Sequence, residues 1–183
     1  FNAIAEAARL RLSEFNSQAF ANTAWAFATA RVEARDLLNA IANAARSRLA
    51  EFKSQELANT AWAFATAGVD SRDFFDTIAD TARSRLAEFS SQEVANTAWA
   101  FATVGVETRD FFNAIADAAR SRLVEFNCQE LANTAWAFAT VGVETRDLFN
   151  AISARAGSRQ LAAAVHDAAY KALALPCPAR KEL

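Results

Sequence analysis

Apolar positions recur along the chain at helical spacing, in two stretches that alternate with short polar breaks. In residues 54–67 they share one broad arc when placed at about 100° per residue, which predicts a first helix. The residues of this arc are Leu57, Ala58, Ala61, Trp62, Phe64 and Ala65. Residues 72–88 have the same periodicity and predict a second helix. Its apolar arc consists of Phe74, Phe75, Ile78, Ala82, Leu86 and Phe89.

This two-helix pattern repeats with a fixed period of 37 residues. The octapeptide NTAWAFAT begins at Asn22, Asn59, Asn96 and Asn133. Residues 53–89 align with residues 90–126 without gaps and differ from them at nine positions. A period of about 20 to 50 residues is typical of solenoids, in which each unit buries its apolar face on its neighbours. The sequence therefore predicts an all-α fold, an α-solenoid of 37-residue helical hairpin repeats.

The repeat array is expected to occupy residues 1–156. Because residues 1–15 match residues 112–126, we expect the array to open in the middle of a unit. After Ile152 the register decays, and residues 157–183 are expected to form a degenerate capping helix and a tail.

Signals for helix ends flank each first helix. Glycine follows three of the four, as expected of a left-handed residue just past a helix C-terminus, whereas the first unit has Arg31 in that place. These glycines are Gly68, Gly105 and Gly142. The polar residues immediately before the first helices differ between units: Asn16, Lys53, Ser90 and Asn127. They are either helix caps, as the spacing of Ser90 and Glu93 indicates, or candidate specificity residues.

The composition excludes several classes of function. The 183 residues are 53% hydrophobic with a net charge of −2, so the chain lacks the basic excess of most nucleic-acid-binding proteins. No apolar run approaches the roughly 18 residues of a membrane span, and we expect no membrane partner. Cys128 and Cys177 match neither a disulfide framework nor a zinc-ligand set, and the one histidine is His166. We expect no metal, no cofactor and no enzymatic activity.

Candidate ligand-binding residues lie on the side of each first helix that faces away from its core. Glutamine, asparagine and threonine recur there at positions i, i+4 and i+11, with the small Ala63 between them in the second unit. The candidates are Gln18, Asn22, Thr29, Gln55, Asn59, Thr66, Gln92, Asn96, Thr103, Gln129, Asn133 and Thr140. Asparagine and threonine are mediocre helix formers, so their recurrence requires a compensating interaction. The asparagines either tie one repeat to the next or present amides to a ligand, for which Ala63 would leave room.

Aromatic and basic residues recur as well, and both have two interpretations. The tryptophan of each octapeptide belongs either to the core between repeats, as its place among alanines favours, or to a base-stacking ladder. Arginines come in pairs on the second helix, such as Arg83 with Arg85. The first of each pair is expected to face water. The second is expected to bond helix-end carbonyls or a neighbouring glutamate rather than phosphate.

The first helices carry almost no charge, since residues 54–67 contain only Glu56 and residues 17–30 contain none. The groove that they line is therefore expected to be neutral and rich in amides. Helical repeat proteins that read RNA use two or three such polar side chains per repeat, one base for each unit. Because glutamine, asparagine and threonine are the same in every unit, we expect weak discrimination between sequences.

The segment LANTAWAFATAGV followed by RDFFDTIADTARSRLAEF resembles heptatricopeptide and octotricopeptide repeats. It is also similar to the repeats of FAST-kinase-like and RAP-domain proteins, and to those of accessory proteins of mitochondrial RNA-editing complexes. Arg31 and the decayed last unit depart from the pattern.

The resemblance implies a protein that binds single-stranded RNA, with possible protein partners, in RNA processing, stability, translation or editing. It also implies a location in the mitochondrion or the chloroplast. A non-enzymatic scaffold for protein–protein interaction is the alternative function.

Overall fold

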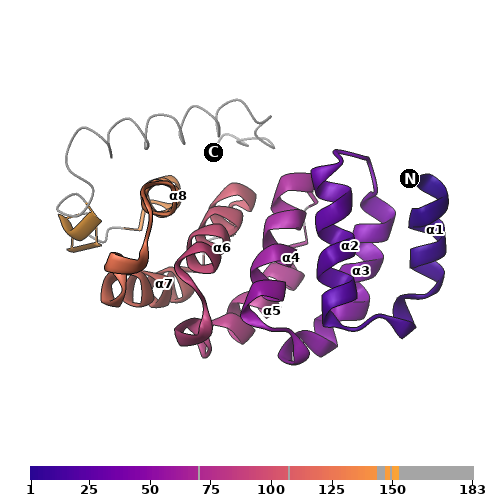
Figure 1. The fold of residues 1–183 in the computed structure, drawn as a ribbon, viewed down its shortest axis with the longest axis horizontal. Helices are drawn as coiled ribbons and strands as arrows, with labels where there is room; N and C mark the ends of the chain where they lie inside the picture. Colours follow the sequence, from indigo (N-terminus) through magenta and orange to yellow (C-terminus); the bar gives the residue numbers. More distant parts are fainter. Residues whose placement is uncertain (70, 107, 144–146, 149, 153–183) are drawn as a thin grey trace.

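The structure is a computed structural model, which describes residues 1–69, 71–106, 108–143, 147–148 and 150–152. Within these residues it is all-α, as predicted (Figure 1). The helices are α1 (Asn2–Leu10), α2 (Ser17–Thr29), α3 (Arg35–Ala45), α4 (Ser54–Ala67), α5 (Arg72–Arg83), α6 (Ser91–Val104), α7 (Arg109–Ser121) and α8 (Cys128–Val141). The predictions for the capping helix, His166 and Cys177 lie outside the described residues.

Each repeat consists of a first helix, a second helix and a short 3-10 turn. The first helices are α2, α4, α6 and α8, and α4 has the predicted bounds. The prediction for the second helix was wrong at its end, because α5 stops at Arg83 and Leu86–Glu88 forms a 3-10 turn. Between them Arg85 leaves the helical region, with φ −123° and ψ 10°. This change of direction leads the chain into the next first helix.

The two kinds of helix form two layers with different packing. Neighbouring first helices contact one another extensively from α2 to α8. Second helices contact one another much less, and each packs partly on the 3-10 turn of the preceding repeat. A layer with closer packing lies on the inner side of a bent array, so the first helices form the inner surface (Figure 1). The predicted groove residues lie on these inner helices.

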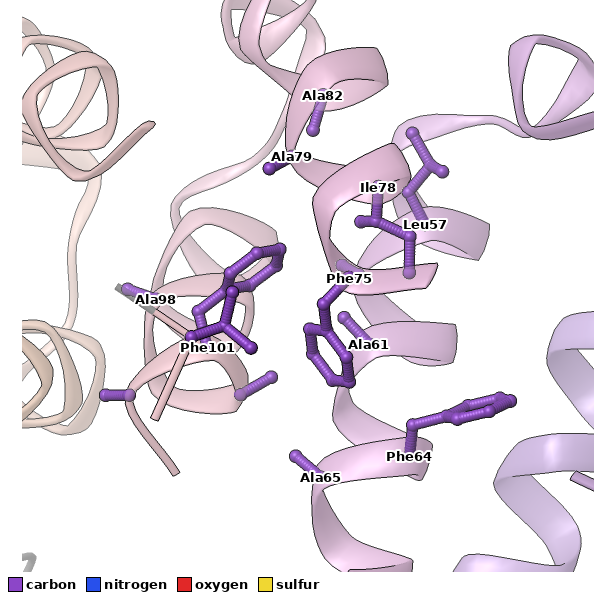
Figure 2. Close-up of a cluster of buried hydrophobic side chains, with 14 of the residues drawn as sticks. Leu57, Ala61, Phe64, Ala65, Phe75, Ile78, Ala79, Ala82, Ala98 and Phe101 are labelled. Atoms are coloured by element: carbon purple, nitrogen blue, oxygen red, sulfur yellow. The ribbon is translucent and has the colours of Figure 1, made fainter. Parts of the chain in front are cut away.

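A continuous hydrophobic core runs between the layers and through the repeats (Figure 2). Phe75 of α5 contacts Phe101 of the next repeat edge to face, with ring centroids 5.0 Å apart. Phe101 in turn contacts Phe111 of its own repeat, at 4.8 Å. Such aromatic pairs add roughly 0.5–1.5 kcal/mol to the free energy of burial. Each repeat is thereby stabilised by its neighbours, which is why the repeats depend on stacking.

Left-handed residues end the first helices. Gly68, Gly105 and Gly142 have φ between 63° and 71°, as predicted. Arg31 occupies the equivalent place after α2 and has φ 53°, although it has a side chain. A left-handed conformation costs a residue with a Cβ roughly 1–2 kcal/mol. The first repeat therefore carries local strain that the other three avoid.

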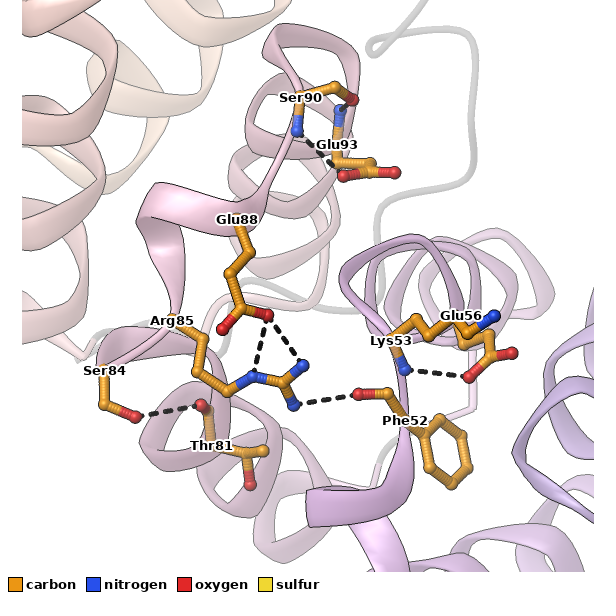
Figure 3. Close-up of polar contacts among 9 residues, drawn as sticks. All are labelled: Phe52, Lys53, Glu56, Thr81, Ser84, Arg85, Glu88, Ser90 and Glu93. Carbon is orange, nitrogen blue, oxygen red and sulfur yellow. Dashed lines mark hydrogen bonds and ion pairs between the residues drawn. The ribbon is translucent and has the colours of Figure 1, made fainter.

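An arginine clamp joins successive repeats (Figure 3). Arg85 donates from Nη1 to the backbone oxygen of Phe52 in the preceding repeat, at 2.8 Å, and from Nη2 to Glu88, at 2.8 Å. Arg48 makes the equivalent bond to Phe15, also at 2.8 Å. The predicted glutamate partner is confirmed for both arginines, whereas the carbonyl that each one bonds belongs to the preceding repeat and not to the end of its own helix. The hydrogen bond from Arg85 also lowers the pKa of the Glu88 carboxyl below its usual value.

Candidate functional site

Glutamine, asparagine and threonine of the four first helices form a polar row along the inner surface. The row consists of the twelve predicted residues, Gln18 to Thr140. All four glutamines are exposed, as is Asn22, and the other three asparagines are half-buried. In each helix the glutamine and the threonine lie within about 40° of the asparagine around the helix axis. The predicted candidates therefore share one accessible face, which is repeated in register from α2 to α8.

Within the part of the chain that the structure describes, the amides of this polar row have no hydrogen-bond partner. Among the described residues, no side-chain hydrogen bond involves the asparagine or glutamine of any first helix. An asparagine ladder between repeats requires such bonds, so the structure does not support that alternative. Each free amide offers two N–H donors and one acceptor oxygen to a ligand.

Three of the four threonines of the polar row are less available than its amides. Thr103 and Thr140 donate their hydroxyl hydrogens to the backbone oxygens of Trp99 and Trp136, at 2.8 and 2.9 Å, and keep only acceptor lone pairs and methyl groups for a ligand. The hydroxyl of Thr66 is enclosed and has no hydrogen-bond partner. Thr29 is exposed, and no hydrogen bond among the described residues involves its hydroxyl.

The expectation that Ala63 leaves room for a ligand was wrong. Ala63, Ala100 and Ala137 are all fully buried, whereas Ala26 of the first repeat is exposed. The difference arises because α2 has no preceding first helix among the described residues. In the other repeats the small side chain allows close approach between neighbouring first helices. Periodicity within one helix could not reveal this, because the contact comes from another repeat.

The variable residues before the first helices act as helix caps. Side-chain oxygens of Asn16, Ser90 and Asn127 accept the backbone N–H three residues later, at 2.8, 3.3 and 2.9 Å. Lys53 has no acceptor atom and retains only the reciprocal bond, from its backbone N–H to Glu56 at 2.8 Å. The geometry supports the capping interpretation for three of the four, and a specificity role for this set stays a prediction.

The inner surface is neutral, whereas the second helices carry the charges. The glutamates of α4, α6 and α8 lie in the first turn and accept from the N-cap backbone, at 2.8 to 2.9 Å. On α5, Arg83 lies 3.9 Å from Asp80, and Arg46, just past the end of α3, lies 3.9 Å from Asp73 of α5. A ligand on the inner surface therefore meets amides and aromatic rings instead of a basic stripe.

The tryptophans lie at the edge of the polar row, and the favoured interpretation of a place in the core between repeats fits three of them but not Trp25. Trp25 is 47% exposed, and Trp62, Trp99 and Trp136 are half-buried against the core. Each lies three residues after the asparagine, about 60° away around the helix axis. Helical projection could have indicated this position, because the tryptophan is the aromatic residue closest to the asparagine face.

Few other groups among the described residues suggest chemistry. That part of the chain holds no cluster of three or more metal-ligating side chains. Cys128 is a free, exposed cysteine at the start of α8. The described helices include none that is long and apolar enough to cross a membrane.

Comparison with known protein families gives a match that covers most of the residues of the repeats. No curated protein matches the chain. A family model described as RNA-editing substrate-binding complex 6 protein matches residues 7–172, which is most of the chain. The resemblance to repeats of RNA-editing accessory proteins is thereby confirmed, while the resemblance to heptatricopeptide, octotricopeptide, FAST-kinase-like and RAP-domain proteins stays a prediction. With its α-solenoid of hairpin repeats, the chain belongs to the RNA-editing substrate-binding complex 6 protein family.

Proposed function

We propose that this chain binds single-stranded RNA along its inner surface and serves, without enzymatic activity, in an RNA-editing complex. The observation that carries the proposal is the polar row of unpartnered amides, repeated from α2 to α8 on an uncharged surface. The family name supports both an RNA ligand and protein partners. The family also favours the mitochondrion as the location, and it adds no support for the chloroplast.

The geometry favours contacts to bases and sugars over contacts to phosphates. An amide can both donate and accept, as the edges of unpaired bases require. The only charges on the first helices are glutamates held in the first turn, so few phosphates are neutralised there. We therefore expect the affinity for RNA to fall only shallowly with rising salt. Because the amides are the same in every repeat, binding is expected to tolerate many sequences.

The test replaces Asn59, Asn96 and Asn133 together by alanine and measures the affinity for fluorescent single-stranded RNA by anisotropy. Each lost hydrogen bond costs about 0.5–1.5 kcal/mol, so the loss of three is expected to raise the dissociation constant at least about tenfold. The helix content by circular dichroism should not fall, because these side chains make no hydrogen bond within the described structure.

The chain offers a matched control on its second helices. Asn39, Asn43 and Asn113 are exposed asparagines of α3 and α7, so their triple replacement by alanine removes the same groups from the outer layer. This control should bind RNA within about twofold of the wild type. If both triple variants bind equally well, the inner surface is not the RNA site.

A protein-binding scaffold is the second candidate function. It is favoured by the net charge of −2 and by the mixed charges of the second helices, such as the ion pair of Arg120 with Asp117 at 2.9 Å. A folded protein without measurable affinity for any RNA would favour the scaffold over the RNA-binding function.

A further inference from the structure

The tryptophans of the chain lie in one place on the fold. The sequence has four tryptophans, Trp25, Trp62, Trp99 and Trp136, one on each first helix. We call them the tryptophan row. None of them belongs to the buried core, which consists of alanine, valine, leucine, isoleucine and phenylalanine. The tryptophan row therefore places partly accessible aromatic rings beside the polar row.

One pair of neighbours in the tryptophan row is in ring contact. The ring centroids of Trp99 and Trp136 are 6.3 Å apart, and the ring planes are inclined by 34°. A base sandwiched between two rings needs about 3.5 Å on each side, which this separation does not provide. The two rings therefore form a continuous strip, and a ligand ring packs against its accessible part instead of entering between them.

The polar ends of these side chains are free as well. Within the described structure, no hydrogen bond involves an indole N–H, and the nitrogens of the three half-buried tryptophans are not among the enclosed, unpartnered atoms. A tryptophan packed into a core usually finds a partner for this donor. Here each indole offers an apolar ring and an unused donor on one accessible edge, beside the free amide of an asparagine.

We propose that the tryptophan row is the base-stacking strip of the RNA site, an inference that rests on the proposed RNA-binding function. Unpaired bases pack on the indoles, while the neighbouring asparagine and glutamine amides bond to base edges. Stacking on an aromatic side chain tolerates all four bases, in agreement with a row that does not change between repeats. The strip selects unpaired RNA, because the bases of a duplex already cover one another's faces.

The chain provides its own probe for this contact. Tryptophan fluorescence reports on the strip alone, since all four tryptophans belong to it. The protein is titrated with single-stranded oligo(A), with a ribose-phosphate oligomer of equal length that lacks bases, and with duplex RNA. Anisotropy of labelled RNA is measured in parallel. We expect oligo(A) to change the fluorescence and to bind at least about tenfold more tightly than the other two ligands.

Variants at Trp25 test the same contact with the least disturbance of packing, because Trp25 is the most exposed member of the row. Trp25→Ala should weaken RNA binding about three- to tenfold, and Trp25→Phe should restore most of the loss. Val124→Ala is the control, because Val124 is 77% exposed and lies in the 3-10 turn that follows a second helix. It should leave RNA binding within about twofold of the wild type.

The outcomes separate this inference from the proposed function. Binding by anisotropy with unchanged fluorescence, or with equal affinity for the oligomer without bases, overturns the stacking strip and leaves the RNA-binding function intact. Equal affinity of Trp25→Ala and the wild type also overturns the strip. If RNA fails to bind by anisotropy, the proposed function itself is overturned.

Discussion

The arginine clamp between repeats makes the sharpest prediction about stability. Arg85→Met keeps most of the aliphatic stem and removes the guanidinium that bonds Phe52 of the preceding repeat. The side chain of Arg85 is only 27% exposed, so the bond is partly shielded from water. A hydrogen bond from a charged group contributes about 1.5 kcal/mol at the lower end of its usual range. We therefore expect the free energy of unfolding to fall by about 1–1.5 kcal/mol.

The control for this variant lies two residues away. Arg83→Met changes the same residue type near the end of α5, but the side chain of Arg83 is 52% exposed and its carboxylate partner, Asp80, is 3.9 Å away. Exposed pairs of this kind contribute little, so the free energy of unfolding should change by less than about 0.5 kcal/mol.

Urea unfolding followed by circular dichroism measures both variants. The midpoint should move to lower urea for Arg85→Met and hardly move for Arg83→Met. In thermal unfolding, the loss at Arg85 should lower the Tm by about 3–5 °C for a chain of this size. Equal destabilisation by the two variants would show that the bond to the preceding repeat contributes no more than an exposed ion pair.

Two further predictions concern the ends of the first helices and use the same urea assay. Arg31→Gly should stabilise the protein by about 1 kcal/mol, because glycine adopts a left-handed conformation without strain. Gly68→Ala should destabilise it by about 1 kcal/mol through the backbone alone, because an added Cβ meets nothing within 4 Å, and a neutral result would contradict this reasoning. Lys53→Ser should stabilise α4 by about 1 kcal/mol by completing the cap that Ser90 forms on α6, whereas Lys53→Ala should have little effect. If Lys53→Ser instead alters the preference among homopolymer RNAs, the residue contributes to specificity and not only to the helix end.

Much of the fold could be predicted from residues within one repeat. The bounds of α4 follow from its apolar periodicity and from Gly68, since both signals act within a single helix. The end of α5 could not be found in this way. Its apolar pattern continues to Phe89, but the backbone changes direction at Arg85, where the guanidinium reaches the carbonyl of the preceding repeat. The same change occurs at Arg11 after α1, with φ −118° and ψ 15°, so it recurs from repeat to repeat, and apolar spacing alone does not reveal it.

The same division applies to the candidate site. The recurrence of Asn59 and its outward position were visible in the sequence, because helical geometry assigns a residue to a face of its own helix. Whether its amide is free depends on what the neighbouring repeat places beside it, and no protein group there bonds to it. Ala63 and Trp62 lie on either side of that face. The prediction failed for Ala63, which is buried, whereas Trp62 packs against the core as the favoured interpretation held and remains partly accessible. The burial of both side chains depends on the spacing between helices.

The 37-residue period was enough to establish the class of fold, the order of the helices and the chemistry of the inner surface. These properties follow from the residues of a single repeat and from the fixed spacing between repeats. The curvature of the array, the arginine clamp and the accessibility of amides and indoles arise only when repeats stack. Stacking sets how closely the first helices approach, and that distance decides which side chains become core and which remain available to a ligand.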